Sequence, residues 1–348
     1  MYIKKKISKL DMIKIDGSSG EAGGQVLRTA LGLSVLTQQP FIIKNIRAKR
    51  PNPGLREQHL QAIRAVKALC DAEVYGDELY SKELKFIPDK ISQKRLDVKI
   101  STAGSTALVL QTLFLASLDN DLSIRVNGGS TWNLHAPSII YLQEVFLPLL
   151  ERIGLRNRIE IIKNGFYPRG GAVVNTVIKK TKLEYFDLVN KEKLNEIKIY
   201  SVASGHLKKA SVAERQSKSA VSLITGHSPD IKINEKLNYV DALCPGSGVL
   251  IAANFENAVI GFDAVGERGK QSEVVGKEAA EGLIRTIKSE AAIDNFMLDQ
   301  ILPFVAVGKG GKFKFSEMTQ HAETNIEIIR KFLDVGFKIK DNILEIEN

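Results

Sequence analysis

The stretch EMTQHAETNIEI, residues 317–328, contains His321, one of five histidines in the chain. Thr324 followed by Glu327 has the spacing of a capping box, which predicts a helix that begins at Thr324 and buries apolar residues between 326 and 333. We therefore expect His321 in the loop before this helix, away from its apolar stripe. A histidine there can act as a nucleophile toward phosphorus or as a proton carrier, and a packed core histidine is the alternative. No second histidine stands at metal-ligand spacing, which excludes H-E-x-x-H chemistry.

A basic segment, IRAKRPNPGLREQH at residues 46–59, combines five basic side chains with a rigid Pro-x-Pro-Gly turn. They are Arg47, Lys49, Arg50, Arg56 and His59. Guanidinium groups match the geometry of phosphate oxygens, and the two prolines and the glycine favour a defined loop shape. The segment is a candidate phosphate contact, and a solvated charged face is the alternative.

Two segments rich in small residues each run into a helical pattern: DGSSGEAGGQVLR at 16–28 and STAGSTALVLQT at 101–112. Such backbones can offer N–H groups to phosphates at the positive end of a helix, and a plain tight turn is the alternative. The first segment has neither the Walker A pattern nor the G-x-G-x-x-G spacing. Its Glu21 would repel a phosphate unless a divalent cation lay between them. Arg28 in the first segment and Gln111 in the second hold equivalent places.

These segments belong to an internal repeat. VLRTALGLS at 26–34 matches VLQTLFLAS at 109–117, and each copy continues into a strand-like run, a loop and an amphipathic helix. A weaker third copy closes the chain, starting with DQILPFVAV at 299–307. If the three units pack about a common axis, their loops between strand and second helix converge. The basic and histidine side chains brought toward one cleft would be Arg47, Arg50, His135 and His321.

An excess of sequence separates the second and third copies. It has its own strand and helix patterns, and it follows a charged, poorly periodic stretch that is typical of a domain edge. The predicted fold class is therefore α/β (α+β), with a large domain of three repeated βα units and a smaller inserted α/β domain. We assign residues 1–184 and 288–348 to the discontinuous large domain and residues 185–287 to the insert.

Composition limits the class of protein. Of 348 residues, 44% are hydrophobic and 26% charged, and no apolar run approaches the roughly 20 residues that a membrane span needs. The two cysteines have neither disulfide-framework nor metal-ligand spacing. The N-terminus MYIKKKISKL does not have the form of a secretory signal, so a cytoplasmic location is expected. A net charge of +9 favours polyanionic partners, although solubility alone could account for it.

Taken in order along the chain, the motifs resemble the RNA 3′-terminal phosphate cyclase family. The resemblance extends over nearly the whole chain, through DGSSGEAGGQVLR, IRAKRPNPGLREQHL, STAGSTALVLQT, GFYPRGGAVV, GERGKQSE, DQILPF and HAETNIEIIRKF. Members have a large domain of three βα repeats and a smaller inserted α/β domain, which agrees with the repeat. Ala22 and Ala172 stand where members often have a further glycine, and neither difference removes a reacting group.

The resemblance implies an ATP-dependent enzyme of the ligase class that acts in RNA processing. A histidine would take AMP from ATP and pass it to an RNA 3′-phosphate, and the neighbouring 2′-OH would then close a 2′,3′-cyclic phosphate. His321 matches the nucleophile. ATP and a divalent cation, Mg or Mn, are the implied cofactors. RNA with a 3′-phosphate end is the implied partner, no membrane partner is expected, and a homodimer is allowed.

The same resemblance assigns further site residues. The ATP site would comprise Gln111, Phe296, Met297, Leu298, Asp299 and Gln300. Glu21 would hold the divalent cation. Phosphate contacts would come from Arg28, Arg47, Arg50 and Gln58.

Two other functions fit similar repeats. A cyclase-like ribosome-assembly or RNA-processing factor shares the fold but lacks the nucleophilic histidine, so the presence of His321 weighs against it. The carboxyvinyl transferases are built from similar repeats but need an enolpyruvate site, which no feature of this sequence demands.

Overall fold

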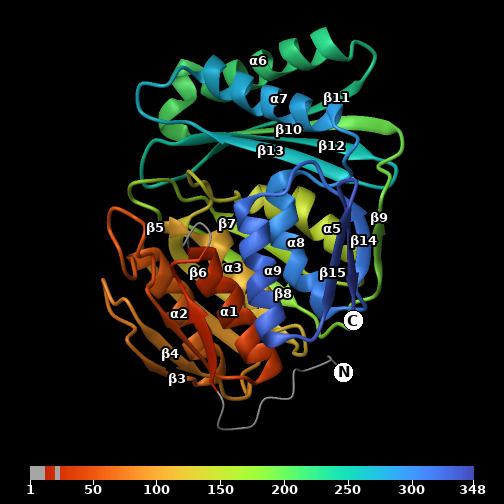
Figure 1. The fold of residues 1–348 in the computed structure, drawn as a ribbon. Coiled ribbons are helices and arrows are strands. Elements are labelled where there is room, and N and C mark those ends of the chain that lie inside the picture. The colour runs from red at the N-terminus through yellow and green to blue at the C-terminus, as the bar shows by residue number, and fades with distance from the viewer. Residues whose placement is uncertain (1–11, 20–23) are drawn as a thin grey trace.

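The computed structural model describes residues 12–19 and 24–348 (Figure 1). One strand order is repeated in three of its sheets. In each, the first two strands are parallel and the later pairings are antiparallel. The orders are β1-β2-β4-β3, β5-β6-β8-β7 and β9-β14-β16-β15. The repeat predicted from the sequence is therefore present in the fold, and each copy also begins with a strand, which the sequence pattern did not reveal. The expected α+β class is confirmed.

Each unit runs strand, helix, strand, helix, strand, strand. The first comprises β1 (Ile13–Asp16), α1 (Gly24–Thr37), β2 (Phe41–Lys44), α2 (Glu57–Cys70), β3 (Glu73–Tyr75) and β4 (Leu84–Ile87). The second comprises β5 (Arg95–Ser105), α3 (Thr106–Ala116), β6 (Leu122–Ser130), a helix formed by α4 (Ile139–Tyr141), a π-helical turn (Leu142–Phe146) and α5 (Leu147–Glu151), then β7 (Arg158–Lys163) and β8 (Val173–Ile178). The third comprises β9 (Phe186–Leu188), α8 (Asn295–Val307), β14 (Gly311–Lys314), α9 (Gln320–Phe332), β15 (Gly336–Lys340) and β16 (Ile343–Glu347).

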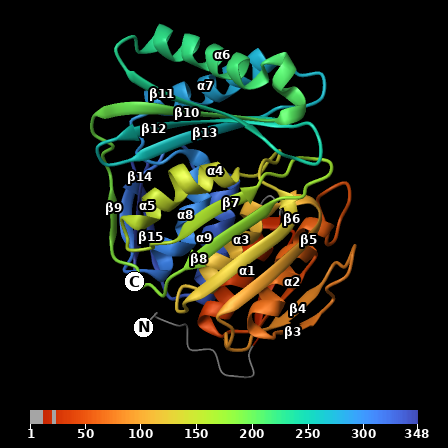
Figure 2. The same ribbon diagram turned by 180° about the vertical axis from the view of Figure 1, so that it is seen from behind.

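The sheets form outer walls around the helices, as the two opposite views show (Figures 1 and 2). The cause is the alternation of side chains along the strands: in β1 and in the first half of β5, buried apolar residues alternate with exposed polar ones. The buried faces pack on the apolar α1, α3 and α8. A parallel strand pair joined through a helix makes that helix run back along its strands, so the three units place equivalent helix ends at one end of the domain.

The insert interrupts the third unit between β9 and α8. It comprises β10 (Leu194–Ser204), a 3-10 turn (Gly205–Ala210), α6 (Val212–His227), β11 (Lys232–Val240), β12 (Ser247–Phe255), β13 (Val259–Val265) and α7 (Ser272–Lys288). Its sheet has the order β11-β10-β12-β13, with α6 and α7 on the side away from the large domain (Figure 1). Because β9 pairs with β14 of the third unit, we propose that the insert begins after Leu188 rather than at residue 185.

The start of α9 differs from the prediction. The helix begins at Gln320, and its N-cap is Thr319, whose hydroxyl accepts a hydrogen bond from the N–H of Ala322 at 3.1 Å. Thr324 lies inside the helix and donates to the carbonyl of Gln320 at 2.6 Å. Two threonines could cap here, and the upstream one does, which adds a helical turn. The expectation that His321 precedes the helix is therefore wrong: His321 lies in its first turn.

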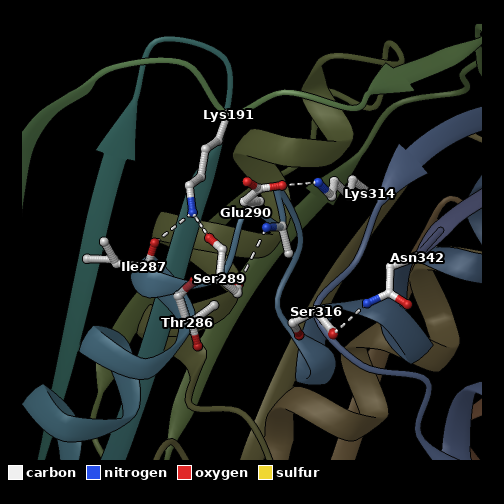
Figure 3. Close-up of polar contacts among 9 residues, drawn as sticks. Lys191, Thr286, Ile287, Ser289, Glu290, Lys314, Ser316 and Asn342 are labelled. Carbon is white, nitrogen blue, oxygen red and sulfur yellow. Dashed lines mark hydrogen bonds and ion pairs between the residues drawn. The ribbon is translucent and has the colours of Figure 1, made fainter.

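Lys191 links the two segments that connect the insert to the large domain (Figure 3). Its ammonium donates to the carbonyl of Ile287 at 2.8 Å and to that of Ser289, at the end of α7. Those carbonyls have no partner within their own helix, and a lysine there also suits the negative end of the helix dipole. Next to it, Glu290 pairs with Lys314 of β14 at 2.5 Å, which ties the returning segment to the large domain. Partial burial lowers the pKa of Lys191, and the charge of Glu290 offsets part of this shift.

Replacement of this lysine tests the link. Lys191→Met keeps the length of the side chain but leaves two carbonyls without their charged donor, so it should lower the free energy of unfolding by about 1–3 kcal/mol. Urea denaturation followed by circular dichroism measures this change. Lys309→Met is the matched control, because the Lys309–Glu184 pair is exposed and such pairs contribute about 0–1 kcal/mol. Equal stability of the Lys191→Met variant and wild type would contradict the proposed role.

Candidate functional site

Three helices meet at their N-terminal halves through the side chain of Asn325 in α9. Its carbonyl oxygen accepts from the hydroxyl of Thr29 in α1 at 2.7 Å, and its amide donates to the backbone carbonyl of Asp299 in α8 at 2.6 Å. Farther along, Gln39, just after α1, donates to the carbonyl of Phe332 at 3.0 Å. Helices α1 and α9 therefore run in the same direction, with their N-terminal ends together. Helix N-termini carry partial positive charge and free N–H groups, which suit anions.

His321 lies one helical turn before Asn325, on the same face of α9. Because Asn325 contacts both α1 and α8, this face of α9 is the one directed at those helices. The side chain of His321 is half-buried. The predicted nucleophile thus stands in the first turn of α9, on the face that Asn325 directs at α1 and α8.

The segment 296–300, predicted as part of the ATP site, divides into two groups. Gln300 accepts from the amide of Gln111 in α3 at 2.5 Å and donates to the carbonyl of Phe296 at 2.7 Å. The ring of Phe296 is 53% exposed and packs edge-to-face on Phe262 of the insert strand β13. Met297 and Leu298, by contrast, are fully buried. Their side chains belong to the core, so only their backbone could contact a nucleotide.

Arg28 and Asp299 form the electrostatic centre of this arrangement. Burial lowers the pKa of Arg28 to about 10, and the nearby charge of Asp299 offsets part of the shift. Burial likewise raises the pKa of Asp299 to about 7, against the attraction of Arg28 and a hydrogen bond of 2.5 Å from the amide of Gln25. Both shifts share one cause, the removal of the two charges from water. A carboxyl group that titrates near neutral pH is typical of functional sites.

The basic segment contacts the start of α1, next to Arg28, through His59 in the first turn of α2. A Cβ atom built on Gly24 would lie 2.5 Å from Nε2 of His59 and 3.0 Å from Nη1 of Arg28, so these two side chains meet at the start of α1. Nδ1 of His59 accepts from the backbone N–H of Arg56 at 2.9 Å. Burial, followed by the charges of Arg28, Arg47 and Arg56, lowers the pKa of His59 to about 3. His59 is therefore neutral at physiological pH.

A small cavity lies beside His59 and Gly24. It is lined by Gly17, Gly24, Leu27, Ile43, Ile46, Arg47 and His59. Arg47 is held there by hydrogen bonds from its guanidinium to the carbonyls of Asn52 at 2.7 Å and Gly54 at 3.3 Å. Arg50 and Gln58 are exposed at the edge of this region. The structure therefore brings Arg28 and Arg47 together, with Arg50 and Gln58 farther toward solvent.

Glu21, the predicted metal ligand, lies outside the described residues. Within residues 12–19 and 24–348, no group of three or more His, Cys, Asp or Glu side chains could hold a metal ion. The same described residues contain no helix that is long and apolar enough to cross a membrane.

Several residues of the site were missed from the sequence. Gln25 and Thr29 lie on α1 beside Arg28, and Asn325 lies within the TNIE pattern that indicated a helix cap. Asn325 was passed over because the TNIE pattern was interpreted as a helix start. Its spacing of four residues from His321 could have indicated that both lie on one face of a helix. His59 was predicted only as one of the basic side chains of residues 46–59, and its place near three arginines becomes evident only in the fold.

The link between Arg28 and Asp299 can be tested by titration. Arg28→Met removes the charge that holds down the pKa of Asp299, so that pKa should rise above about 7. Carbon-13 NMR of aspartate-labelled protein would follow the carboxyl resonance against pH. A matched control is Arg64→Met, which removes an exposed arginine paired with Glu57. An unchanged or lower pKa of Asp299 in Arg28→Met would contradict the coupling.

Comparison with known proteins places the chain in a family. The family model of RNA 3′-terminal phosphate cyclase matches residues 19–339. A curated protein of that name from Saccharolobus solfataricus is 44% identical over 329 residues, which cover 94% of this chain and 96% of the relative. Another of the same name, from Pyrococcus furiosus, is 40% identical over 338 residues, with 96% and 97% covered. The chain therefore belongs to the RNA 3′-terminal phosphate cyclase family.

Proposed function

We propose that this protein converts the 3′-phosphate end of an RNA into a 2′,3′-cyclic phosphate at the expense of ATP, with His321 as a covalent carrier of AMP. The proposal takes the activity from the names of relatives that match nearly the whole chain. The assignment of the AMP carrier to His321 is supported by its position. His321 lies in the first turn of α9, one turn before Asn325, which contacts α1 and α8.

The proposed reaction has three steps. A nitrogen of His321 attacks the α-phosphorus of ATP, so that an N–P bond forms and the bond to the pyrophosphate oxygen breaks. An oxygen of the RNA 3′-phosphate then attacks the same phosphorus, which breaks the N–P bond and leaves AMP on the RNA. Finally the 2′-oxygen attacks the 3′-phosphorus and its proton passes to water. The bond from that phosphorus to the phosphate oxygen of AMP breaks, so AMP leaves. The covalent histidine divides one difficult activation into two transfers.

The charges at the site suit these steps. Arg28 and Arg47 would neutralise phosphate oxygens as the bonds change, and the helix N-termini would add N–H groups and partial positive charge. Gln111 and Gln300, already bonded to each other, together with the exposed ring of Phe296, would hold the nucleotide. A divalent cation bound through Glu21 would supply further neutralisation of the phosphates.

The non-catalytic alternative predicts a different outcome. A ribosome-assembly or RNA-processing factor of this fold would bind RNA without forming a bond to AMP. His321, with its position at the N-terminal end of α9, favours the enzyme. The family match likewise weighs against a carboxyvinyl transferase.

Labelling with ATP tests the proposed nucleophile. Wild-type protein incubated with magnesium or manganese and ATP labelled at the α-phosphate should retain an acid-labile, alkali-stable label, since phosphoramidates behave in this way. His321→Ala should retain none. The control is His227→Ala, which alters an exposed histidine at the end of α6 in the insert. Equal labelling of wild type and His321→Ala would remove His321 from the mechanism.

The activity is scored separately on a short RNA that ends in a 3′-phosphate. The expected product resists phosphatase and forms only when ATP is present. Wild-type protein that binds this RNA but leaves its end open to phosphatase would instead support the non-catalytic alternative.

A further inference from the structure

An exposed tyrosine stands beside the basic segment on a rigid support. Tyr80 donates its backbone N–H to the carbonyl of Leu55 at 2.9 Å, and Leu55 donates to the carbonyl of Ser81 at 2.9 Å. Gly54 lies against the same backbone at φ +82°, where a Cβ atom would stand 2.2 Å from the carbonyl oxygen of Tyr80. The basic segment and the loop that carries Tyr80 therefore form one fixed unit.

The side chain of Tyr80 is stacked against Arg56. The guanidinium carbon of Arg56 lies 5.1 Å from the centre of the ring, in a cation–π contact, and the tyrosine is 61% exposed. Tyr80 also adopts a φ of +67°, a region that non-glycine residues seldom occupy. The chain thus holds a large, flat, partly apolar group in water at some conformational cost, and such features are concentrated at binding surfaces.

The basic segment that supports Tyr80 carries a strong positive charge. Arg47, Lys49, Arg50 and Arg56 come from the basic segment. Among nearby carboxylates, Asp77 pairs with Lys67 at 3.3 Å and Glu57 pairs with Arg64 at 2.9 Å, while Glu78 shares the loop of Tyr80. Burial lowers the pKa of Arg47, and repulsion from Arg56 and Arg50 adds to the shift. A bound polyanion would relieve this repulsion.

We propose that Tyr80 and Arg56 bind a nucleotide of single-stranded RNA that lies 5′ of its terminal phosphate, with a base stacked on Tyr80 and a phosphate on the charged edge. The inference rests on the proposed function, because it takes the RNA end to lie at Arg28 and Arg47. The basic segment connects the two places: Arg47 belongs to the same rigid segment as Arg56 and also lines the cavity at His59 and Gly24. Aromatic stacking combined with a basic surface is the common way to hold single strands without reading their sequence.

Binding is measured by the fluorescence anisotropy of a 5′-labelled, 3′-phosphorylated single-stranded RNA. Tyr80→Ala should weaken binding by about tenfold, since base stacking on an aromatic residue contributes about 1–3 kcal/mol. Tyr80→Trp should bind at least as well as wild type. Tyr185→Ala is the matched control: Tyr185 is 48% exposed, but Asp187, Glu345 and Glu347 surround it, so binding should not change. Circular dichroism confirms that each variant is folded.

Two further measurements separate stacking from charge. In wild type, replacing one of the last few nucleotides by an abasic residue should weaken binding, and this loss should disappear in Tyr80→Ala. The slope of log affinity against log salt is negative. Arg56→Gln should make it less steep by about 0.7, the value for one phosphate contact on a single strand. Tyr80→Ala should leave that slope unchanged.

Kinetics separate this inference from the proposed function. Tyr80→Ala should raise the KM for RNA while the AMP labelling of the protein and kcat stay at wild-type values. If wild type cyclises RNA but Tyr80→Ala has the same affinity and KM, the inference is wrong and the proposed function stands. Tyr167, which is 77% exposed, is the other tyrosine to test. If Tyr167→Ala loses affinity for RNA and Tyr80→Ala does not, the base stacks on Tyr167 and the inference is wrong. An acidic peptide that competes with RNA in wild type but not in Tyr80→Ala, while RNA binds both equally, would also overturn it.

Discussion

The amide side chain of Asn325 is the contact on which the arrangement of the site depends. It accepts from Thr29 and donates to the backbone of Asp299, so a single side chain joins α1, α8 and α9. An aspartate in its place could accept but not donate, and a leucine could do neither. Because the contact is made beside the first turn of α9, it sets the position of His321 relative to Arg28.

The repeated unit could be predicted from the sequence because its information is local. Apolar residues recur at helical spacing in each copy, and the segments 26–34 and 109–117 keep their order of residue types. Contacts between units cannot be predicted in this way. Strand β9 has three residues, and its pairing with β14 crosses the whole insert, so nothing in the local pattern indicated it. Strand β11 gives only a weak local signal, because its exposed residues are mostly polar, as suits the edge of a sheet.

The predicted site residues show which positions local patterns can indicate and which only the fold can place. Arg47 was a candidate phosphate contact because it lies in the basic segment, whereas Arg28 was assigned by the family resemblance. The fold places both side chains near His59. The start of α9 was placed too late, because two threonines offered similar caps and only tertiary packing chose between them. Met297 and Leu298 lie within a segment that resembles a nucleotide site, yet helical periodicity turns their side chains into the core. A motif names a stretch of chain, whereas the helix decides which of its side chains face a ligand.

The position of the insert has a consequence for the order in which the chain can fold. Strand β9 leaves the ribosome before the insert, but its partner β14 follows only after α7 and α8. During synthesis the first two units and the sheet of the insert can pair their own strands, whereas the third unit must wait for the C-terminal residues. Such a distant pairing has a high contact order and forms late. The third unit, which carries His321 on α9, therefore completes its sheet after the first two units, and the site is complete only once this unit has formed.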